Sequence, residues 1–297
     1  MAPRLPDRSA APTIGVVTVS YGSGSVLSGF LASVPVGSAS PLHVVVVDNL
    51  PGPDSGVDEM TRRVGAHYLP MADNVGYGAA MDAGVAALPT QVEWVLLSNP
   101  DVVLSPGAID ELVAVGREDD RIATVGPKIL TSEGEVYPSA RAVPSLRTGV
   151  GHALFVNLWV GNPWTRAYRN DAAGPVERRD AGWLSGACLL VRRSAFEELG
   201  GFDPGYFMYF EDVDLGFRFG KLGYRNVYAP EAVVTHSGAH STTTESESER
   251  MISAHHDSAR RFLAQKYSGT WLWPIRVGLT IGLRLRSAVI RRRVTRQ

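Results

Sequence analysis

The N-terminal third of the chain alternates short apolar runs with segments in which apolar residues recur at helical spacing. The apolar runs occupy residues 13–20, 43–47, 66–69 and 92–97, and most of them are rich in Val, Ile or Leu. Strands that are apolar on both faces and are separated by helices predict a parallel sheet covered by helices on both sides. The sequence therefore predicts an α/β fold in which ligands bind at the carboxyl ends of the strands.

Polar side chains directly follow three of these predicted strands. Tyr21 follows the first strand, Asp48 and Asn49 follow the second, and Asn99 and Asp101 follow the last. Folding of the sheet should bring these residues to one edge. An ordinary turn is the competing explanation for Asp48 and Asn49 alone, because both residue types favour turns. The repetition at another strand end favours a ligand site.

A glycine-containing segment opens a predicted helix that runs to about residue 88. It carries Asn74, Gly76 and Gly78. Backbone amides at a helix start can bind a diphosphate, although glycines at a helix entry also occur for steric reasons. The sequence contains no P-loop motif and no G-x-G-x-x-G after the first strand, so it supports neither a P-loop kinase nor an ordinary dinucleotide site.

Residues 206–214 place four aromatic side chains directly before the carboxylates Glu211, Asp212 and Asp214. A carboxylate beside an apolar wall is poorly hydrated, which raises its affinity for a proton and makes it a better general base. The alternative is that these acids only charge the first turn of a helix, where they suit the helix dipole. The segment taken alone leaves both explanations open.

The charge distribution narrows the class of partner. Twenty-nine basic and 30 acidic residues give a net charge of −1, which argues against a nucleic-acid binder. After residue 250 the only acid is Asp257, whereas ten Lys and Arg residues follow, so we expect an anionic partner at the C-terminus. The single cysteine, Cys188, excludes an internal disulfide and fits a reducing cytosol. Its apolar surroundings indicate a buried hydrophobic residue rather than a nucleophile.

The length of 297 residues predicts one elaborated domain with a C-terminal appendage. Residues 1–12 lack the apolar core of a signal peptide, and we expect a disordered leader there. Residues 238–249 are polar and acidic, which predicts a mobile loop or a lid over a bound ligand. Residues 275–290 are apolar but contain three arginines, which disfavours a transmembrane span. An interfacial helix on an anionic membrane is favoured over a helix packed on the domain.

Six motifs, in this order and spacing, resemble those of glycosyltransferase family 2. They are Asp48-Asn49, Asn74-x-Gly76-x-Gly78, Ser98-Asn99-Pro100-Asp101, Trp183-Leu184-Ser185-Gly186-Ala187, Phe210-Glu211-Asp212-x-Asp214 and His236. The chain looks most like the actinobacterial members that transfer rhamnose to polyprenyl-diphosphate-linked N-acetylglucosamine. The resemblance implies a GT-A fold, an α/β/α sandwich at residues 13–241. Its nucleotide-sugar half would be 13–115 and its acceptor half 116–241, followed by a helical, basic, membrane-associating extension at 242–297.

The resemblance also implies roles for single residues in donor binding. Asp48 would bind the pyrimidine base, with Tyr21 nearby, and Asp101 would hold a divalent cation, magnesium or manganese, on the diphosphate. His236 would complete the metal shell, although a lone histidine after a strand is more often structural. Asn99 replaces the first acid of the family's D-x-D motif, so the site has one carboxylate fewer. Asn74, Gly76 and Asn99 complete the implied nucleotide-sugar site.

For the reaction, the resemblance implies Asp212 as the general base, with Glu211, Asp214 and Trp183 in supporting roles; a core aromatic is the alternative for Trp183. The implied reaction is inverting, metal-dependent transfer of L-rhamnose from dTDP-L-rhamnose in the biosynthesis of the cell-wall arabinogalactan linker. The enzyme would be cytoplasmic and peripheral on the inner face of the plasma membrane. The motifs do not distinguish rhamnose from a galactofuranosyl or mannosyl donor. A catalytically silent nucleotide-binding protein at the membrane is the alternative from another functional class. A homodimer is also compatible with the sequence.

Overall fold

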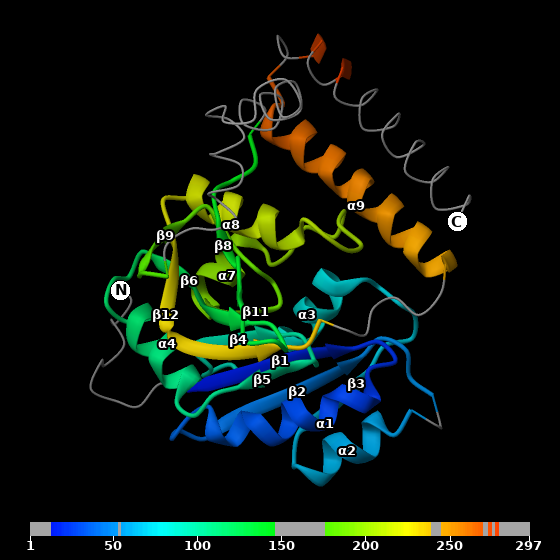
Figure 1. Cartoon of the computed structure of the whole chain (residues 1–297), viewed down its shortest axis with the longest axis vertical. Coiled ribbons are helices and arrows are strands. Elements are labelled where there is room, and N and C mark those ends of the chain that lie inside the picture. The colour runs from blue at the N-terminus through cyan, green and yellow to red at the C-terminus, as the bar shows by residue number, and fades with distance from the viewer. Residues whose placement is uncertain are drawn as a thin grey trace.

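The computed structural model describes residues 13–52, 55–145, 176–238, 245–269, 273–274 and 277–278. Figure 1 shows a central twisted sheet with helices on both faces. The strand order in this sheet is β3-β2-β1-β4-β11-β6-β12-β5. The predicted leader at residues 1–12 lies outside the described residues, as do residues 239–244 of the predicted loop. Residues 245–249 of that loop are helical, so the loop prediction is wrong there.

The first four strands form the predicted parallel sheet. They are β1 (Ile14–Ser20), β2 (Leu42–Asp48), β3 (His67–Pro70) and β4 (Trp94–Ser98), and each pair of neighbours is parallel. Continuous apolar sequence fits these strands because both faces of the sheet are buried. The carboxyl ends of β1, β2 and β4 consequently lie along one edge, as expected from the sequence.

The other half of the sheet, for which the apolar runs of the N-terminal third made no prediction of strand direction, is mixed. Strand β11 (Cys188–Arg192) runs antiparallel to both β4 and β6 (Ile122–Leu130). Strand β12 (Arg225–His236) is parallel to β6 and antiparallel to β5 (Val102–Leu104). A parallel pair needs a long crossover connection, and β5 follows β4 after only three residues, so β5 joins the far edge instead.

Two hydrophobic cores, one on each face of the sheet, confirm the three-layer sandwich. Helices α1 (Gly24–Ser33), α2 (Val57–Arg63) and α4 (Ala108–Gly116) contribute to one core. The other core is formed with the following helices: α3 (Tyr77–Ala86), α7 (Arg193–Leu199) and α8 (Glu211–Lys221). Each helix buries one apolar face against the sheet, which fixes the position of its first turn relative to the strand ends.

Four short strands extend the C-terminal half of the fold. Strand β7 (Val136–Tyr137) pairs with β6, and β9 (Arg179–Ala181) pairs with β12. A separate two-stranded ladder joins β8 (Ala140–Arg141) to β10 (Trp183–Leu184), with Arg141 opposite Trp183. This ladder leads directly into residues 185–187 and then into β11.

The long helix α9 (Glu245–Lys266) lies beside α8 on the same side of the sheet (Figure 1). Its residues Ala259 and Phe262 are buried, and Phe262 packs against Phe210 and Phe217. Among the described residues, no helix has both the length and the apolar character needed to cross a bilayer. Residues 275–290, apart from 277 and 278, lie outside the described part of the chain.

Candidate active site

Asp101, Asn99 and His236 meet where β4 and β12 end. The antiparallel pairing of β12 with β5 sets His236 opposite Val102, and so beside Asp101. His236 Nε2 lies 3.1 Å from Asp101 Oδ1 and 3.4 Å from Asn99 Nδ2. Sheet topology therefore assembles the three residues that the resemblance places at the donor diphosphate.

The Asp101–His236 pair is chemically suited to a divalent cation. Burial would raise the pKa of Asp101, but the hydrogen bond and charge of His236 outweigh it, and the pKa lies below its ordinary value. The carboxylate is therefore ionised at neutral pH. One carboxylate oxygen and one imidazole nitrogen suit manganese, while magnesium commonly binds through one carboxylate plus substrate phosphates. In the described ranges no group of three or more His, Cys, Asp or Glu side chains gathers at one point, so the remaining ligands would come from a diphosphate.

Asp212 lies in the first turn of α8 and is held by two backbone amides. Gly186 N–H donates to Oδ2 at 2.9 Å and Val213 N–H donates to Oδ1 at 2.8 Å. Burial raises the pKa of Asp212 in spite of these hydrogen bonds and of the positive charge of Arg141. Each oxygen keeps a lone pair for an acceptor hydroxyl, so Asp212 is both oriented and basic.

Residues 186 and 187 join this carboxylate to the Asp101–His236 pair. Gly186 N–H bonds to Asp212, while the Ala187 carbonyl accepts a 2.8 Å hydrogen bond from Asn99 N–H. Tyr77 contacts the same turn, because its hydroxyl donates a 2.6 Å hydrogen bond to the Gly186 carbonyl. Burial, followed by the charges of Glu211 and Asp212, raises the pKa of Tyr77 well above its ordinary value, so it remains a donor. Tyr77 is not among the residues predicted from the sequence, where its place inside the glycine motif is the only signal.

Two consecutive aromatic residues precede α8 in a strained backbone conformation. Tyr209 has φ 66° and Phe210 has φ 65°, both in the left-handed region. Such residues cost about 1–3 kcal/mol each and persist only where surrounding contacts hold them. Helix α9 supplies these contacts: Ser258 Oγ donates to the Met208 carbonyl at 2.9 Å, and the His255 ring lies 5.5 Å and 5.4 Å from the rings of Tyr209 and Phe210. Three of the four predicted wall aromatics, Tyr206, Tyr209 and Phe210, thus contact α9.

The two acids beside Asp212 have different surroundings. Asp214 is buried and forms an ion pair with Arg218, with 2.5 Å between Oδ2 and Nε. Glu211 is also buried, and burial together with the charge of Asp212 raises its pKa. Its Oε2 has no hydrogen-bond partner in the described part of the chain. The ion pair of Asp214 with Arg218 indicates a role in stabilising the fold. Glu211, by contrast, lies close enough to Asp212 for the two carboxyl groups to affect each other's protonation.

Asp48 reaches the predicted edge of the sheet but is fully buried. Its Oδ2 accepts a 3.0 Å hydrogen bond from the Tyr68 hydroxyl, and its Oδ1 accepts one from Leu50 N–H at 3.2 Å. Burial, and then the hydrogen bond to Asp48, raises the pKa of Tyr68 to about 12. Tyr21, by contrast, is 53% exposed at the end of β1. A hydrogen bond from the pyrimidine base of a nucleotide to Asp48 would therefore use a second lone pair of a carboxylate oxygen that already accepts one hydrogen bond.

The segment at residues 74–77 connects the end of β2 to the segment that precedes Asp212. Asn49 Nδ2 donates to Asn74 Oδ1 at 3.1 Å, and Gly76 N–H donates to the same oxygen at 3.1 Å. Tyr77 N–H donates to the Phe207 carbonyl at 3.0 Å, so two amides of the expected diphosphate seat already have acceptors. A Cβ on Gly76 would lie 2.4 Å from the Phe207 oxygen. The backbone at residue 76 lies so close to the Phe207 carbonyl that only a residue without a side chain fits there.

Trp183 and Cys188 have mainly structural contacts. Trp183 Nε1 donates to the Ala142 carbonyl at 3.1 Å, and the ring packs in the cluster that contains Val213. Cys188 is buried and burial raises its pKa to about 12, as expected for an inert thiol.

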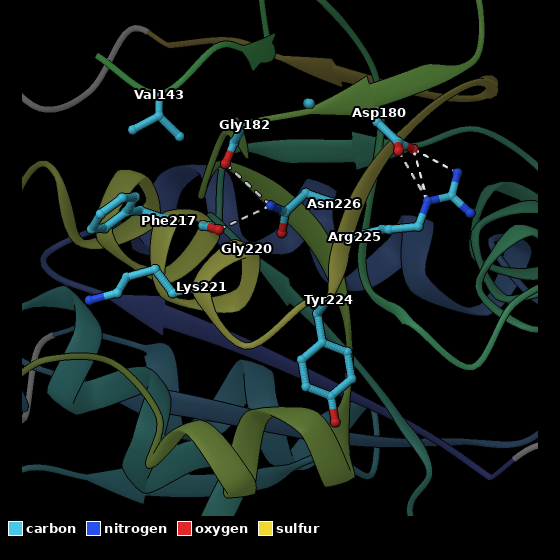
Figure 2. Close-up of a pocket in the computed structure, with 11 residues that line it drawn as sticks. Val143, Asp180, Gly182, Phe217, Gly220, Lys221, Tyr224, Arg225 and Asn226 are labelled. Atoms are coloured by element: carbon cyan, nitrogen blue, oxygen red, sulfur yellow. Dashed lines mark hydrogen bonds and ion pairs between the residues drawn. The ribbon is translucent and has the colours of Figure 1, made fainter. Parts of the chain in front are cut away.

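A groove of about 330 Å³ lies beside β9, β12 and α8, and none of the predicted site residues lines it. Figure 2 shows Asn226 pointing to the backbone at its centre, where Nδ2 donates to the carbonyls of Gly182 and Gly216. Arg225 and Asp180 form an ion pair at one end. The hydrogen bonds of Asn226 and the ion pair of Arg225 thus use groups that line the groove itself.

Sequence comparison assigns most of the chain to one family. Residues 11–254 match the model described as "Glycosyltransferase like family 2". The chain is 45% identical over 283 residues to N-acetylglucosaminyl-diphospho-decaprenol L-rhamnosyltransferase of Mycobacterium tuberculosis, covering 92% of this chain and 91% of that one. It is 39% identical over 84 residues to rhamnosyltransferase WbbL of Escherichia coli, covering 28% of this chain and 31% of that one.

Solved structures with the same fold come from distant glycosyltransferases. The mannosyltransferase PcManGT of Pyrobaculum calidifontis, solved with GDP-Man and Mn²⁺, aligns with a TM-score of 0.58 and 15% identity, over 98% of this chain and 75% of that one. GalNAc-T7, solved with UDP, GalNAc and Mn²⁺, aligns with a TM-score of 0.56 and 16% identity, over 82% and 48%. These similarities establish the GT-A fold. Together with the family match, they show that the chain belongs to glycosyltransferase family 2.

Proposed function

We propose that the protein transfers L-rhamnose from dTDP-L-rhamnose to polyprenyl-diphosphate-linked N-acetylglucosamine. The observation that carries this proposal is the position of Asp212, which one short turn, residues 186–187, joins to the Asp101–His236 pair. A base and a cation-binding pair in such proximity suit displacement of a nucleoside diphosphate from a sugar. The choice of sugar and acceptor rests on the 45% identity to the M. tuberculosis rhamnosyltransferase.

Asp212 would remove the proton from the acceptor hydroxyl as the oxygen attacks the anomeric carbon of the donor. Its raised pKa makes it a stronger base, and the amides of Gly186 and Val213 hold its orientation. Direct attack by the acceptor inverts the anomeric configuration. A divalent cation, magnesium or manganese, held by Asp101 and His236 would stabilise the charge on the departing diphosphate.

The remaining predicted residues would complete the donor site. Asn99 adjoins the cation pair, and its side-chain amide lies 3.4 Å from His236 Nε2. Asp48 and Tyr21, at neighbouring strand ends, would contact the nucleoside. Asn74 and Gly76 would contribute by shaping the loop between nucleotide and acceptor.

We further propose peripheral binding to the cytoplasmic face of the plasma membrane, because a polyprenyl acceptor stays in the bilayer. The ten basic residues after position 250 suit anionic lipid. Trp273 and Val277 are 60% and 47% exposed, as interfacial anchors would be. Three parts of the chain would then have separate tasks: donor binding at 13–115, acceptor binding at 116–241 and membrane association at 242–297. The biological role would be synthesis of the arabinogalactan linker. A homodimer stays a prediction.

A donor screen tests the proposal. The full-length protein is incubated with a short polyprenyl-diphosphate N-acetylglucosamine acceptor, Mg²⁺ or Mn²⁺, and one of dTDP-rhamnose, a UDP-galactofuranose or GDP-mannose, and products are identified by mass. We expect a product one deoxyhexose heavier, formed only with dTDP-rhamnose. Transfer from another donor would replace the sugar assignment, and an absence of both transfer and donor hydrolysis would indicate a silent nucleotide-binding protein.

A further inference from the structure

Arg141 faces the candidate site from the small β8–β10 ladder. Its ladder partner is Trp183, and the adjacent pair Ala140 and Leu184 is buried in a core cluster with Tyr228. Because side chains alternate between the faces of a strand, Arg141 and Trp183 lie on the opposite face. Trp183 packs there with Val213 of α8, so this face adjoins the helix that carries the base.

The guanidinium of Arg141 is oriented by neutral groups. Its Nε donates to the Pro138 carbonyl at 2.9 Å, and its central carbon lies 5.8 Å from the Trp183 ring centroid and 5.9 Å from that of Tyr137. The ion pairs of the described residues involve other arginines, such as Arg218 with Asp214. Arg141 is thus a partly buried cation, and within the described ranges its terminal nitrogens have no hydrogen-bond or ion-pair partner that would compete with an anion.

The positive charge of Arg141 is felt at Asp212, where it opposes the rise in pKa that burial causes. The ladder position of Arg141 lies three residues before Gly186, whose amide holds Asp212. The chain passes from the ladder through Ser185 into the 186–187 turn, so Arg141 and the carboxylate of Asp212 both border this short segment.

We propose that Arg141 binds the diphosphate of the lipid-linked acceptor. Asp212 would then take the proton of the attacking hydroxyl on the sugar that carries this diphosphate. This inference rests on the proposed function. The donor also carries a diphosphate, but the Asp101–His236 pair lies on the other side of the 186–187 turn and serves that group. Arg141 would therefore select acceptors that carry a diphosphate, through the paired hydrogen bonds that guanidinium forms with phosphate oxygens.

The test combines an arginine substitution with removal of the acceptor phosphates. Wild type, Arg141→Gln and Arg141→Lys are assayed with the polyprenyl-diphosphate sugar and with an alkyl glycoside of N-acetylglucosamine, which has the same hydroxyl but no phosphate. Arg121→Gln, a variant of a surface arginine that pairs with Asp119, is the matched control. Thermal unfolding verifies that each variant is folded.

We expect Arg141→Gln to lower kcat/KM for the diphosphate acceptor about 10- to 100-fold, the effect of losing a hydrogen bond to a charged group. The glycoside should respond little, and KM for the nucleotide-sugar should not change. Arg141→Lys keeps the charge without the fork and should lose less; it also carries the test if the glutamine variant does not fold.

Equal losses on the two acceptors would overturn the inference and assign Arg141 to positioning Trp183. A higher KM for the nucleotide-sugar would overturn it in favour of the donor diphosphate. If the wild type transfers the sugar to the diphosphate acceptor and Arg141→Gln does so with the same kinetics, the role of Arg141 is rejected and the proposed function stands. Failure of the wild type to transfer to the diphosphate acceptor would remove the proposed function and this inference together.

Discussion

Gly186 donates its backbone N–H to Asp212 Oδ2 at 2.9 Å, although the two residues belong to different elements of the fold. A Cβ on Gly186 would approach the Cβ of Asp212 to 3.3 Å, so a glycine allows this close contact. Asp212, the proposed base, is therefore oriented by the same turn that contacts Asn99 through Ala187. One turn thus connects the two ends of the candidate site.

Replacement of the base should separate catalysis from folding. We expect Asp212→Asn to lose at least two decades of kcat, since positioned general-base catalysis contributes about 10²–10⁴-fold. Asp214→Asn is the matched control: loss of the pair with Arg218 should cost about 1–3 kcal/mol of stability, because Arg218 is partly exposed, with kcat per folded molecule nearly retained. Kinetics and urea unfolding measure the two effects, and near-wild-type turnover by Asp212→Asn would reject the base assignment.

Removal of the cation-binding carboxylate should act on donor binding. Asp101→Ala deletes the oxygen that lies 3.1 Å from His236 Nε2, and one of two protein ligands is lost. We expect calorimetric affinity for dTDP-rhamnose to fall and to become insensitive to Mn²⁺ and to EDTA. The same metal-dependent affinity in wild type and variant would contradict the assignment of Asp101.

The buried carboxylate of Asp82 should make stability depend on pH. Burial raises its pKa to about 6, against the hydrogen bond from Phe202 N–H and the charge of Arg218. The folded state therefore binds more protons than the unfolded state between about pH 4 and 6, and stability falls as pH rises through this window. Asp82→Asn keeps an acceptor for Phe202 without the charge. Its Tm relative to wild type should increase from pH 4 to pH 7, and a constant difference would refute the prediction.

Gly76 and Gly134 offer a matched pair of glycines with positive φ, 85° and 82°. An alanine at Gly134 meets no atom within 4 Å, so Gly134→Ala should cost only the backbone strain of about 1–2 kcal/mol. Gly76→Ala would place its Cβ against the Phe207 carbonyl and push the base segment away. We expect a larger loss of stability and a lower kcat than for Gly134→Ala. Equal behaviour of the two variants in unfolding and turnover assays would count against this role of Gly76.

The C-terminal segment should be needed for attachment to lipid. A chain ending at Tyr267 retains α9 but loses seven of the ten basic residues after position 250, together with Trp273. We expect full-length protein to sediment with liposomes that contain anionic lipid and the truncated chain to stay in the supernatant. High salt should weaken the full-length interaction, because the attraction is electrostatic. Unchanged sedimentation would exclude this segment as the anchor.

Local patterns in the sequence predicted the parts of the fold that depend on local physics. The apolar runs predicted β1, β2 and β4, and the acids after Phe210 predicted the start of α8. The direction of β11 was not predictable, because a strand's orientation depends on its connections rather than on its own residues. Asp212 stands out in sequence as an acid beside aromatics. Tyr77 does not, since its role rests on a hydrogen bond to a backbone carbonyl more than a hundred residues away.

The left-handed conformation of Tyr209 and Phe210 determines which part of the site fails first on heating. Both residues would relax to an ordinary backbone if the contacts from His255 and Ser258 were lost. Undocking of one helix requires less energy than melting of the sheet. The protein should therefore become inactive below its melting temperature, with the strands that contact the donor still intact.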